Sequence, residues 1–336
     1  MKARNILKLV PEGLYCEAGD FFIDPVRKVP RAVITHGHAD HARPGHEAVL
    51  ATRATLDVMQ ARYGARYARA EQALKYGEAI TIGDARLSLH PAGHVLGSAQ
   101  ACVEVGGARI IVSGDYKRTP DPTCTPFEVL NCDIFVTEAT FGLPVFRHPP
   151  PEGEVNRLLA SMKLFDDRVH HVAAYSLGKA QRLLALLRRQ GYDQPVMVDR
   201  ATATLCDLYE RHGVKLGPLE LLQSGSRSSG RIAIAPPSAR EHFAGDEDDA
   251  PITSFASGWM RVLKRARSGG GDLPLIISDH ADWTELTTTI EEISPQELWI
   301  THGEEAALMS WARQKGIPAQ PLSIAGYGSD DDGEDA

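Results

Sequence analysis

The sequence has few cysteines and no long hydrophobic run. The five cysteines among 336 residues are scattered and never stand in a C-x-x-C spacing, which argues against a disulfide framework and a structural zinc ribbon. No apolar run approaches the roughly 20 residues of a membrane span. The first residues, Met1 to Leu7, lack the apolar core of a signal peptide. Together these absences predict a cytoplasmic protein with no membrane partner.

The negative charge of the chain is unevenly distributed. The net charge is −8, but nine acidic residues lie in two clusters, at 246–249 and 330–335, so the rest of the chain carries +1. The second cluster ends the chain and predicts an acidic disordered tail over 327–336. Net charge therefore neither excludes nor favours a polyanionic substrate.

Several short apolar runs end abruptly at polar residues. Runs of this length, rich in Val and Ile, predict buried strands of an α/β fold. Each is followed by a His, Asp or Glu, so we expect distant parts of the sequence to meet at one active site. The five runs are 32–34, 109–112, 134–136, 275–277 and 298–300.

The pattern changes between residues 148 and 254. Strands are predicted at 169–174, 195–198 and 232–235, with helices at 178–189 and 201–211 between them. This β-α-β-α-β order predicts a small, doubly wound inserted domain. Because residues typical of metal sites resume after it, we expect the first domain to be split into 1–147 and 255–326.

The strongest motif is the run from His36 to His41, which reads His-Gly-His-Ala-Asp-His. His36 and His38 are one residue apart after a strand, so both imidazoles can leave the chain on the same side. Asp40 and His41 can address a second ion. A histidine-rich surface turn is the alternative, but the small residues between the histidines favour a metal site.

A catalytic ion needs three or four protein ligands and an open position for water, so this run alone supplies too few ligands. His94, in a loop, and Asp115, at the end of a predicted strand, are the next candidates. Taken singly, each would be an ordinary loop histidine or turn aspartate.

These residues carry a resemblance. Asp24, the run 36–41, His94 and Asp115 resemble the metallo-β-lactamase superfamily in order and spacing, and Glu138, His280, His302 and the inserted domain resemble its β-CASP nuclease branch. The segments 137–142, 175–181, 257–261 and 278–282 are most similar to bacterial ligase-associated DNA exonucleases, which have often been called mRNA 3′-end processing factors. The resemblance spans roughly residues 10 to 326 and implies an αββα sandwich with an inserted β-CASP-type α/β domain.

The resemblance also implies roles. It implies two divalent metal ions, zinc or manganese, that share a water and activate it as a bridging hydroxide. Asp24 would orient a ligand, and Asp40, Glu138 and His280 would be catalytic, with His280 as the general acid paired with Glu138. One ion would take His36, His38, His94 and Asp115, and the other Asp40, His41, Asp115 and His302.

Substrate contacts are predicted more weakly. Ser176, Gly178 and Lys179 follow a predicted strand and open a helix, where backbone N–H groups and a lysine can hold a phosphate. Plain helix capping explains the same residues. Lys117 and Arg118 lie just beyond Asp115 and are predicted to touch the nucleic-acid backbone.

The resemblance predicts a DNA exonuclease in DNA repair, with a DNA ligase or helicase as its partner. RNA processing by an RNase J-like or 3′-end-processing enzyme is the main alternative, because no reader of the 2′-hydroxyl is identifiable in the sequence. A lactonase- or thioesterase-like hydrolase would leave Glu138 and His280 idle. A non-catalytic scaffold would be expected to have lost metal ligands, and none is missing here. Cleavage polarity, strand preference and oligomeric state stay open.

Overall fold

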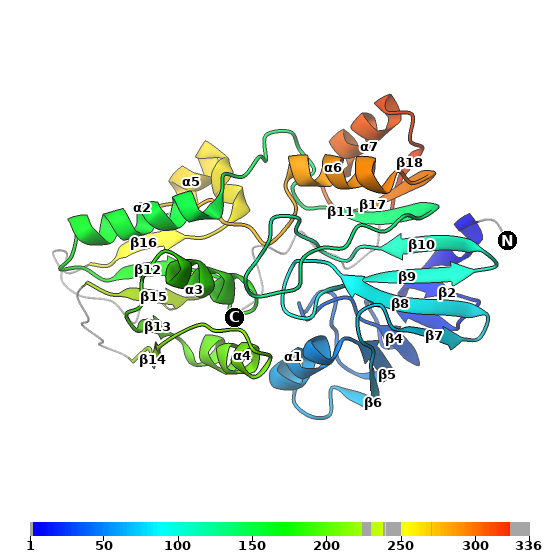
Figure 1. The fold of residues 1–336 in the computed structure, drawn as a ribbon, viewed down its shortest axis with the longest axis horizontal. Coiled ribbons are helices and arrows are strands. Elements are labelled where there is room, and N and C mark those ends of the chain that lie inside the picture. Colours follow the sequence, from blue (N-terminus) through cyan, green and yellow to red (C-terminus); the bar gives the residue numbers. More distant parts are fainter. Residues whose placement is uncertain (1–2, 224–229, 238, 240–249, 270, 323–336) are drawn as a thin grey trace. The chain divides into compact units, whose positions relative to one another are not determined.

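The computed structural model describes residues 3–223, 230–237, 239, 250–269 and 271–322 (Figure 1). They form two compact units. The first unit lies within Met1–Pro144 and His280–Asp332, and the second within Val145–Asp279. Both units combine helices with β-sheets, so the prediction of an α/β fold is confirmed. The predicted acidic tail, 327–336, and the acidic cluster at 246–249 lie outside the described residues.

The first unit contains two sheets. One has six strands that are neighbours in sequence order, from β1 to β6. The other has seven strands in the order β18-β17-β11-β10-β9-β8-β7, in which β10, β11, β17 and β18 run parallel. The strands of the first sheet are β1 (Leu7–Val10), β2 (Gly13–Cys16), β3 (Phe21–Ile23), β4 (Arg31–Val33), β5 (His46–Ala51) and β6 (Ala68–Ala73). Those of the second are β7 (Ala79–Ile82), β8 (Ala85–Pro91), β9 (Ala99–Val105), β10 (Ala108–Val112), β11 (Ile134–Ala139), β17 (Glu297–Gly303) and β18 (Ala319–Pro321).

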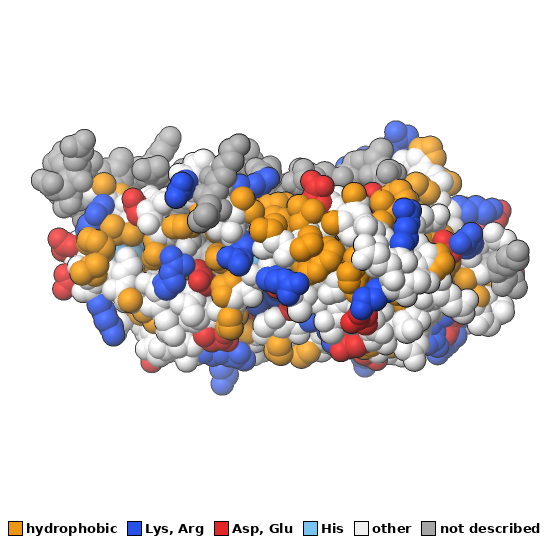
Figure 2. Space-filling view, turned by 90° about the horizontal axis from the view of Figure 1, so that it is seen from above, with side chains coloured by type: hydrophobic (Ala, Val, Ile, Leu, Met, Phe, Trp, Pro, Cys, Tyr) orange, Lys and Arg blue, Asp and Glu red, His pale blue; other side chains and the backbone are white. Residues whose placement is uncertain are grey.

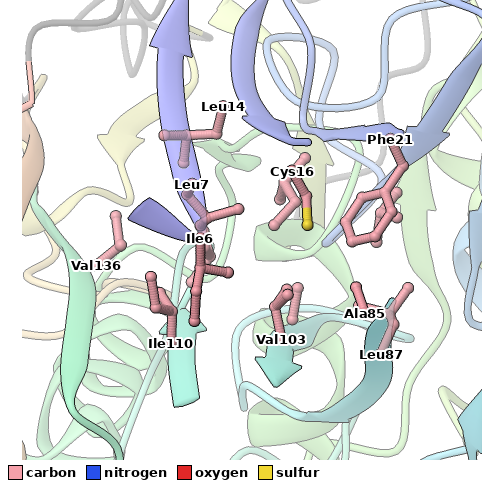
Figure 3. Close-up of a cluster of buried hydrophobic side chains, with 14 of the residues drawn as sticks. Ile6, Leu7, Leu14, Cys16, Phe21, Ala85, Leu87, Val103, Ile110 and Val136 are labelled. Carbon is pink, nitrogen blue, oxygen red and sulfur yellow. The ribbon is translucent and has the colours of Figure 1, made fainter. Parts of the chain in front are cut away.

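The two sheets pack face to face around the largest apolar cluster of this unit. Figure 3 shows Leu14 and Phe21 of the first sheet opposite Leu87 and Val103 of the second. The outer face of the second sheet is covered by α6 (Trp283–Ile293) and α7 (Glu305–Gln314), and that of the first sheet by α1 (Arg53–Tyr63). Four layers result, helix, sheet, sheet and helix. Burial of both faces explains why the strands read as continuous apolar runs.

The start of α6 is fixed by its own sequence. Asp282 caps the helix by accepting from the Glu285 N–H, and the Glu285 carboxylate accepts in return from the Asp282 N–H. Such reciprocal caps contribute about 1 kcal/mol to helix stability. The cap also fixes where the chain enters the helix just after His280.

The second unit is built on a five-stranded parallel sheet in the order β14-β13-β15-β12-β16. Its strands are β12 (His170–Ala173), β13 (Val196–Val198), β14 (Leu219–Leu221), β15 (Ile232–Ala235) and β16 (Ile252–Phe255). Its helices are α2 (Pro151–Leu164), α3 (Lys179–Arg189), α4 (Arg200–Arg211) and α5 (Leu263–Gly269), and short 3-10 turns lie at η4 (Gly258–Arg261) here and at η1 (Ala3–Asn5) in the first unit. The strands and helices predicted over 169–235 are present within a residue or two of their expected ends.

One feature differs from the sequence prediction. The run Leu275–Ile277 makes a single bridge, between Ala256 and Leu275, instead of a strand. Pro274 has no N–H to donate, and the Ile276 N–H donates to the Glu154 carboxylate at 2.9 Å, so a ladder cannot continue there. The second unit runs on to Asp279, and the Ala256–Leu275 bridge joins its last segment to the end of β16. The domain bounds given in the sequence analysis stay predictions.

Within the part of the chain that the structure describes, every helix is too short or too polar to cross a bilayer.

His46, at the start of β5, is a buried neutral imidazole. Its side chain is 2% exposed, and its Nδ1 accepts a hydrogen bond from the Val29 N–H at 3.2 Å. Burial lowers the pKa of His46 from its ordinary 6.5 to about 4. Between these two values the unfolded chain binds a proton that the folded protein does not. The contribution of neutral His46 to the free energy of unfolding is therefore fully present above about pH 6.5 and is lost as the pH falls towards 4.

His46→Gln should remove this share of the acid sensitivity, because glutamine cannot be protonated and its amide oxygen can accept from Val29. Between pH 7 and pH 4, the wild type should lose up to about 3 kcal/mol more of its free energy of unfolding than the variant loses. Urea unfolding of both proteins at several pH values measures it. Parallel pH profiles would show that His46 does not contribute.

Candidate metal centre

Chemistry-bearing side chains from six places in the first unit meet at the carboxyl ends of its strands. His36, His38, Asp40 and His41 lie in the loop after β4, and Asp115 follows β10. The remaining four lie in the β8–β9 loop (His94), in β11 (Glu138), just before α6 (His280) and in β17 (His302). The first sheet supplies the histidine-rich loop, the second sheet supplies His94, Asp115, Glu138 and His302, and the segment before α6 supplies His280.

The side chains form overlapping groups of ligand atoms, each group within 4.8 Å. One group has the four members that the resemblance implies for the first ion. A second group shares His36 with it and adds Asp40 and His41, and a third shares Asp115 with it and adds His302. The groups are His36, His38, His94 and Asp115; His36, Asp40 and His41; and His41, Asp115 and His302. We call these seven residues the ligand cluster.

Asp115 stands at the centre of the cluster. Its Oδ2 lies 3.4 Å from His36 Nε2, 3.5 Å from His41 Nε2 and 3.9 Å from His94 Nε2. Around it, His94 Nε2 lies 3.0 Å from His38 Nδ1, and the rings of His41 and His302 stack at 4.8 Å. Several imidazole nitrogens thus converge on one carboxylate.

The donor set fits divalent metal ions. His36 Nε2 and Asp115 Oδ1 are buried and lack a hydrogen-bond partner among the residues that the structure describes. Buried polar atoms nearly always have a hydrogen-bond partner. Two such atoms in one group of ligand atoms therefore indicate that a further partner, such as a metal ion, binds there. Imidazole nitrogens and carboxylate oxygens suit zinc, and manganese accepts the same mixture.

The electrostatics keep the carboxylates ionised. Burial alone would raise the pKa of Asp115, but His41 and His280 outweigh it and hold that pKa well below its ordinary value. The pKa of Asp40 is lowered against burial in the same way, chiefly by His41. Against the effect of burial, Asp40 and Asp115 raise the pKa of His41 well above its ordinary value. Anionic oxygens are therefore in place to bind cations.

Asp24 orients His41. Its Oδ2 accepts from His41 Nδ1 at 2.8 Å, and its Oδ1 accepts from the Thr35 N–H at 2.8 Å. This contact fixes the tautomer and turns Nε2 of His41 towards Asp115. The backbone φ angles of Asp24 and His302 are +42° and +54°, which residues other than glycine rarely adopt. Strain of this kind concentrates at functional sites.

His280 and Glu138 form a separate pair, the acid pair, beside the ligand cluster. His280 Nδ1 lies 3.0 Å from Glu138 Oε2 and 4.0 Å from Asp115 Oδ2. Glu138 is 1% exposed, and its Oε1 accepts from the Tyr116 N–H at 2.7 Å. Burial raises the pKa of Glu138, and His280 counteracts part of that rise. Glu138 thus holds Nδ1 of His280.

The structure gives Lys117 and Arg118 partners within the first unit. Lys117 is 4% exposed, and its Nζ donates to the His280 carbonyl and to Glu285. Arg118 donates to Thr289 and Glu292. Their predicted contacts with nucleic acid stay predictions.

In the second unit, Gly178 begins α3 with φ +84°, and its N–H donates to the Gln181 side chain. Ser176 is buried (4% exposed), and its carbonyl accepts from the Gln181 side-chain amide at 2.9 Å. Lys179 is 1% exposed and lies 3.3 Å from Asp279 Oδ1. Helix capping, the plainer explanation of this motif, is present, whereas phosphate binding stays a prediction.

Two residues that bind predicted site residues were not predicted from the sequence. Thr35 donates from its N–H and its hydroxyl to Asp24, and Glu285 accepts from Lys117. Thr35 could have been suspected from its place directly before His36. Nothing near Glu285 in the sequence points to Lys117, which is 168 residues away.

The comparisons identify relatives of this chain. A probable DNA ligase of Opitutus terrae is 30% identical over 315 residues, which is 91% of this chain and 30% of that protein. The endoribonuclease YSH1 of Gibberella zeae is 34% identical over 121 residues, which is 34% of this chain and 14% of that protein. This chain therefore spans less than a third of the length of either relative.

A shorter relative is covered almost completely. It is an uncharacterized protein in the lig 3′ region of Acidianus ambivalens, 30% identical over 150 residues, which is 42% of this chain and 99% of that protein. A crystal structure of a protein of unknown function from Enterococcus faecalis has a TM-score of 0.58 at 14% identity, over 89% of this chain and 80% of that one, and so shares the fold. No family model matches the chain. Together with the order of the motifs, these relatives show that the chain belongs to the β-CASP nuclease family.

Proposed function

We propose that this chain is a two-metal-dependent phosphodiesterase that degrades DNA as an exonuclease in DNA repair. The observation that carries the proposal is the ligand cluster around Asp115 with the acid pair 3.0 Å apart beside it. The cluster suits two cations, and the acid pair suits proton transfer. A hydrolase of small molecules would need the first feature alone.

The chain's own residues divide the work of hydrolysis. Two bound divalent ions would supply the positive charge that activates a water and neutralises the phosphate. The ligand cluster would hold them, with Asp115 common to both, while Asp24 keeps His41 in the binding tautomer. His280, with Nδ1 held by Glu138, would deliver a proton from Nε2 to the departing 3′ oxygen.

In this proposal the four-layered first unit is a metallo-β-lactamase sandwich, and the second unit is the inserted β-CASP-type domain. The first assignment rests on the layer order of the first unit. The second rests on the all-parallel sheet of the second unit, whose residues come between the two parts of the first unit in the sequence.

The choice of DNA rests on the relatives. One is named a probable DNA ligase, and another lies in a lig 3′ region. This chain matches 30% of the length of the probable DNA ligase. We therefore propose DNA as the substrate and a DNA ligase as the partner. On the face shown in Figure 2, Lys and Arg side chains lie among Asp and Glu side chains and do not form one continuous patch.

RNA cleavage is the second candidate, and the endoribonuclease relatives favour it. YSH1 proteins of Gibberella zeae and Neurospora crassa match 34% of this chain at 34% and 35% identity. The matched segment is short, whereas the ligase match covers 91% of the chain.

End-labelled single-stranded DNA and RNA of the same sequence, each incubated with zinc or manganese, test the substrate. We expect DNA to be shortened stepwise and RNA to be degraded at most slowly. Asp40→Ala should lower cleavage by at least about 100-fold, because Asp40 belongs to the ligand cluster. Degradation of RNA alone would overturn the DNA assignment, and unchanged cleavage by Asp40→Ala would contradict the metal mechanism.

A further inference from the structure

Lys117 is a buried cation directly beside the acid pair, and the proposed hydrolysis gives it no task. It lies two residues after Asp115 and is 4% exposed. Its Nζ donates to the His280 carbonyl at 2.9 Å and to Glu285 Oε2 at 2.7 Å. Burying an ammonium is unfavourable unless it is paired and hydrogen-bonded, so the position of this cation is specific.

The partner of Lys117 is itself fixed from several sides. Glu285 closes the N-terminal cap of α6 with Asp282 and also accepts from the Thr119 N–H at 2.6 Å and from its hydroxyl at 2.5 Å. Lys117 and Glu285 lower each other's freedom to move. The carbonyl of His280 is therefore held by a group that is anchored to the start of α6.

The neighbouring backbone completes the connection. The Ala281 N–H donates to the Tyr116 carbonyl at 2.6 Å, and the Tyr116 N–H donates to Glu138 Oε1 at 2.7 Å. Each of residues 115–117 thus has a separate task. Asp115 is the central member of the ligand cluster, and the Tyr116 N–H binds the Glu138 carboxylate. The Tyr116 carbonyl and the Lys117 ammonium hold the N–H and the carbonyl of the His280–Ala281 peptide bond. One short segment sets the position of the acid pair relative to Asp115.

We propose that Lys117 is a positioning residue that acts through the main chain of His280 and does not bind a substrate phosphate. This inference rests on the proposed function. Two of the three ammonium protons are already donated to buried protein acceptors. Removing the ammonium would let the His280 imidazole move, and a misplacement of about 1 Å can lower a rate by roughly 100-fold.

The test uses two phosphodiesters that differ in leaving group. DNA releases a 3′ alkoxide that needs a proton, whereas bis(p-nitrophenyl) phosphate releases a stable phenolate that does not. With DNA, Lys117→Met should lower kcat by about 10- to 100-fold and leave KM unchanged. With the nitrophenyl ester, the loss should stay below about 3-fold, since the metal centre is intact. Lys117→Arg should restore part of the rate on DNA.

The double variant with His280→Ala separates positioning from an independent role. If Lys117 acts through His280, the double variant is no slower on DNA than His280→Ala alone. Lys315→Met is the matched control, because this exposed lysine also pairs with a glutamate of α6, at 2.8 Å from Glu291. If Lys117→Met fails to fold because Glu285 is left unpaired, the double variant Lys117→Met/Glu285→Gln removes both charges together. The same measurements are then made on that variant.

The outcomes are distinguishable. A raised KM on DNA, an equal loss on both substrates, or losses that multiply in the double variant would each overturn the role of Lys117. If His280→Ala itself loses as much rate on the nitrophenyl ester as on DNA, the acid pair, and with it the proposed mechanism, is wrong. Metal content and thermal midpoint, measured for every variant, exclude a loss of the centre.

Discussion

Asp115→Asn is expected to abolish most metal binding and to lower cleavage by at least about 1000-fold. The Oδ2 atom of Asp115 lies within 4.0 Å of nitrogens of His36, His41, His94 and His280. Asparagine keeps the shape of the side chain but removes its negative charge. It also places either an amide N–H₂ group or a weaker oxygen where cations would bind. Both ions would lose a ligand at once.

Metal analysis of the purified protein checks this prediction. Wild type should bind about two equivalents of zinc or manganese, and the variant should bind less than one after mild dialysis. Asp133→Asn is the matched control, because Asp133 accepts from the Arg109 N–H at 2.7 Å in the same unit but away from the cluster. A variant that keeps two ions and its activity would show that Asp115 is not the shared ligand.

Much of the site could be predicted from sequence because most of its residues lie in or just after the last residues of strands. The runs before His36 and Asp115 are, within a residue, strands β4 and β10. The runs before Glu138 and His302 lie in β11 and β17, which continue three residues past the predicted ends and so contain Glu138 and His302. Parallel strands place their carboxyl ends at one edge, so polar residues after several such strands meet. The short spacing within 36–41 adds a local signal.

The remaining features depend on contacts between distant residues. Leu275–Ile277 has the composition of a strand, but Pro274 and the acceptor Glu154 divert its N–H groups. Lys117 lies two residues after Asp115, where the sequence predicts a contact with nucleic acid, and in the structure its buried Nζ donates to Glu285. Neither partner is recognisable by spacing. Local patterns predict which residues carry chemistry, whereas tertiary pairing determines what each cation does.

The strain at Asp24 illustrates the same limit. A sequence that reads Ile-Asp-Pro gives no sign of a positive φ. The conformation is held because the carboxylate accepts from Thr35 and from His41 Nδ1. Three hydrogen bonds, one of them to an imidazole whose pKa is raised, offset a backbone cost of about 1–3 kcal/mol.

His280→Ala is expected to keep both metal ions and to lower DNA cleavage by about 100- to 10,000-fold, which is the contribution of a general acid. In the proposed mechanism Nε2 of His280 donates the proton, since Nδ1 is paired with Glu138. Glu138→Gln should have a smaller effect in the same direction, because an amide can still accept from Nδ1 but no longer stabilises the positive charge of the imidazolium.

Metal content decides between the two roles that the geometry of His280 allows. His280, Glu138 and Asp115 together offer three ligand atoms within 4.8 Å, so His280 is also placed to bind a cation. As an acid, it leaves metal stoichiometry unchanged when it is removed. As a ligand, its loss would lower the stoichiometry and the rate on every phosphodiester alike. His90→Ala is the control, because His90 Nδ1 also lies 3.0 Å from a glutamate, Glu128, but outside the ligand cluster. Retained metal with a loss confined to DNA would therefore assign the proton transfer to His280.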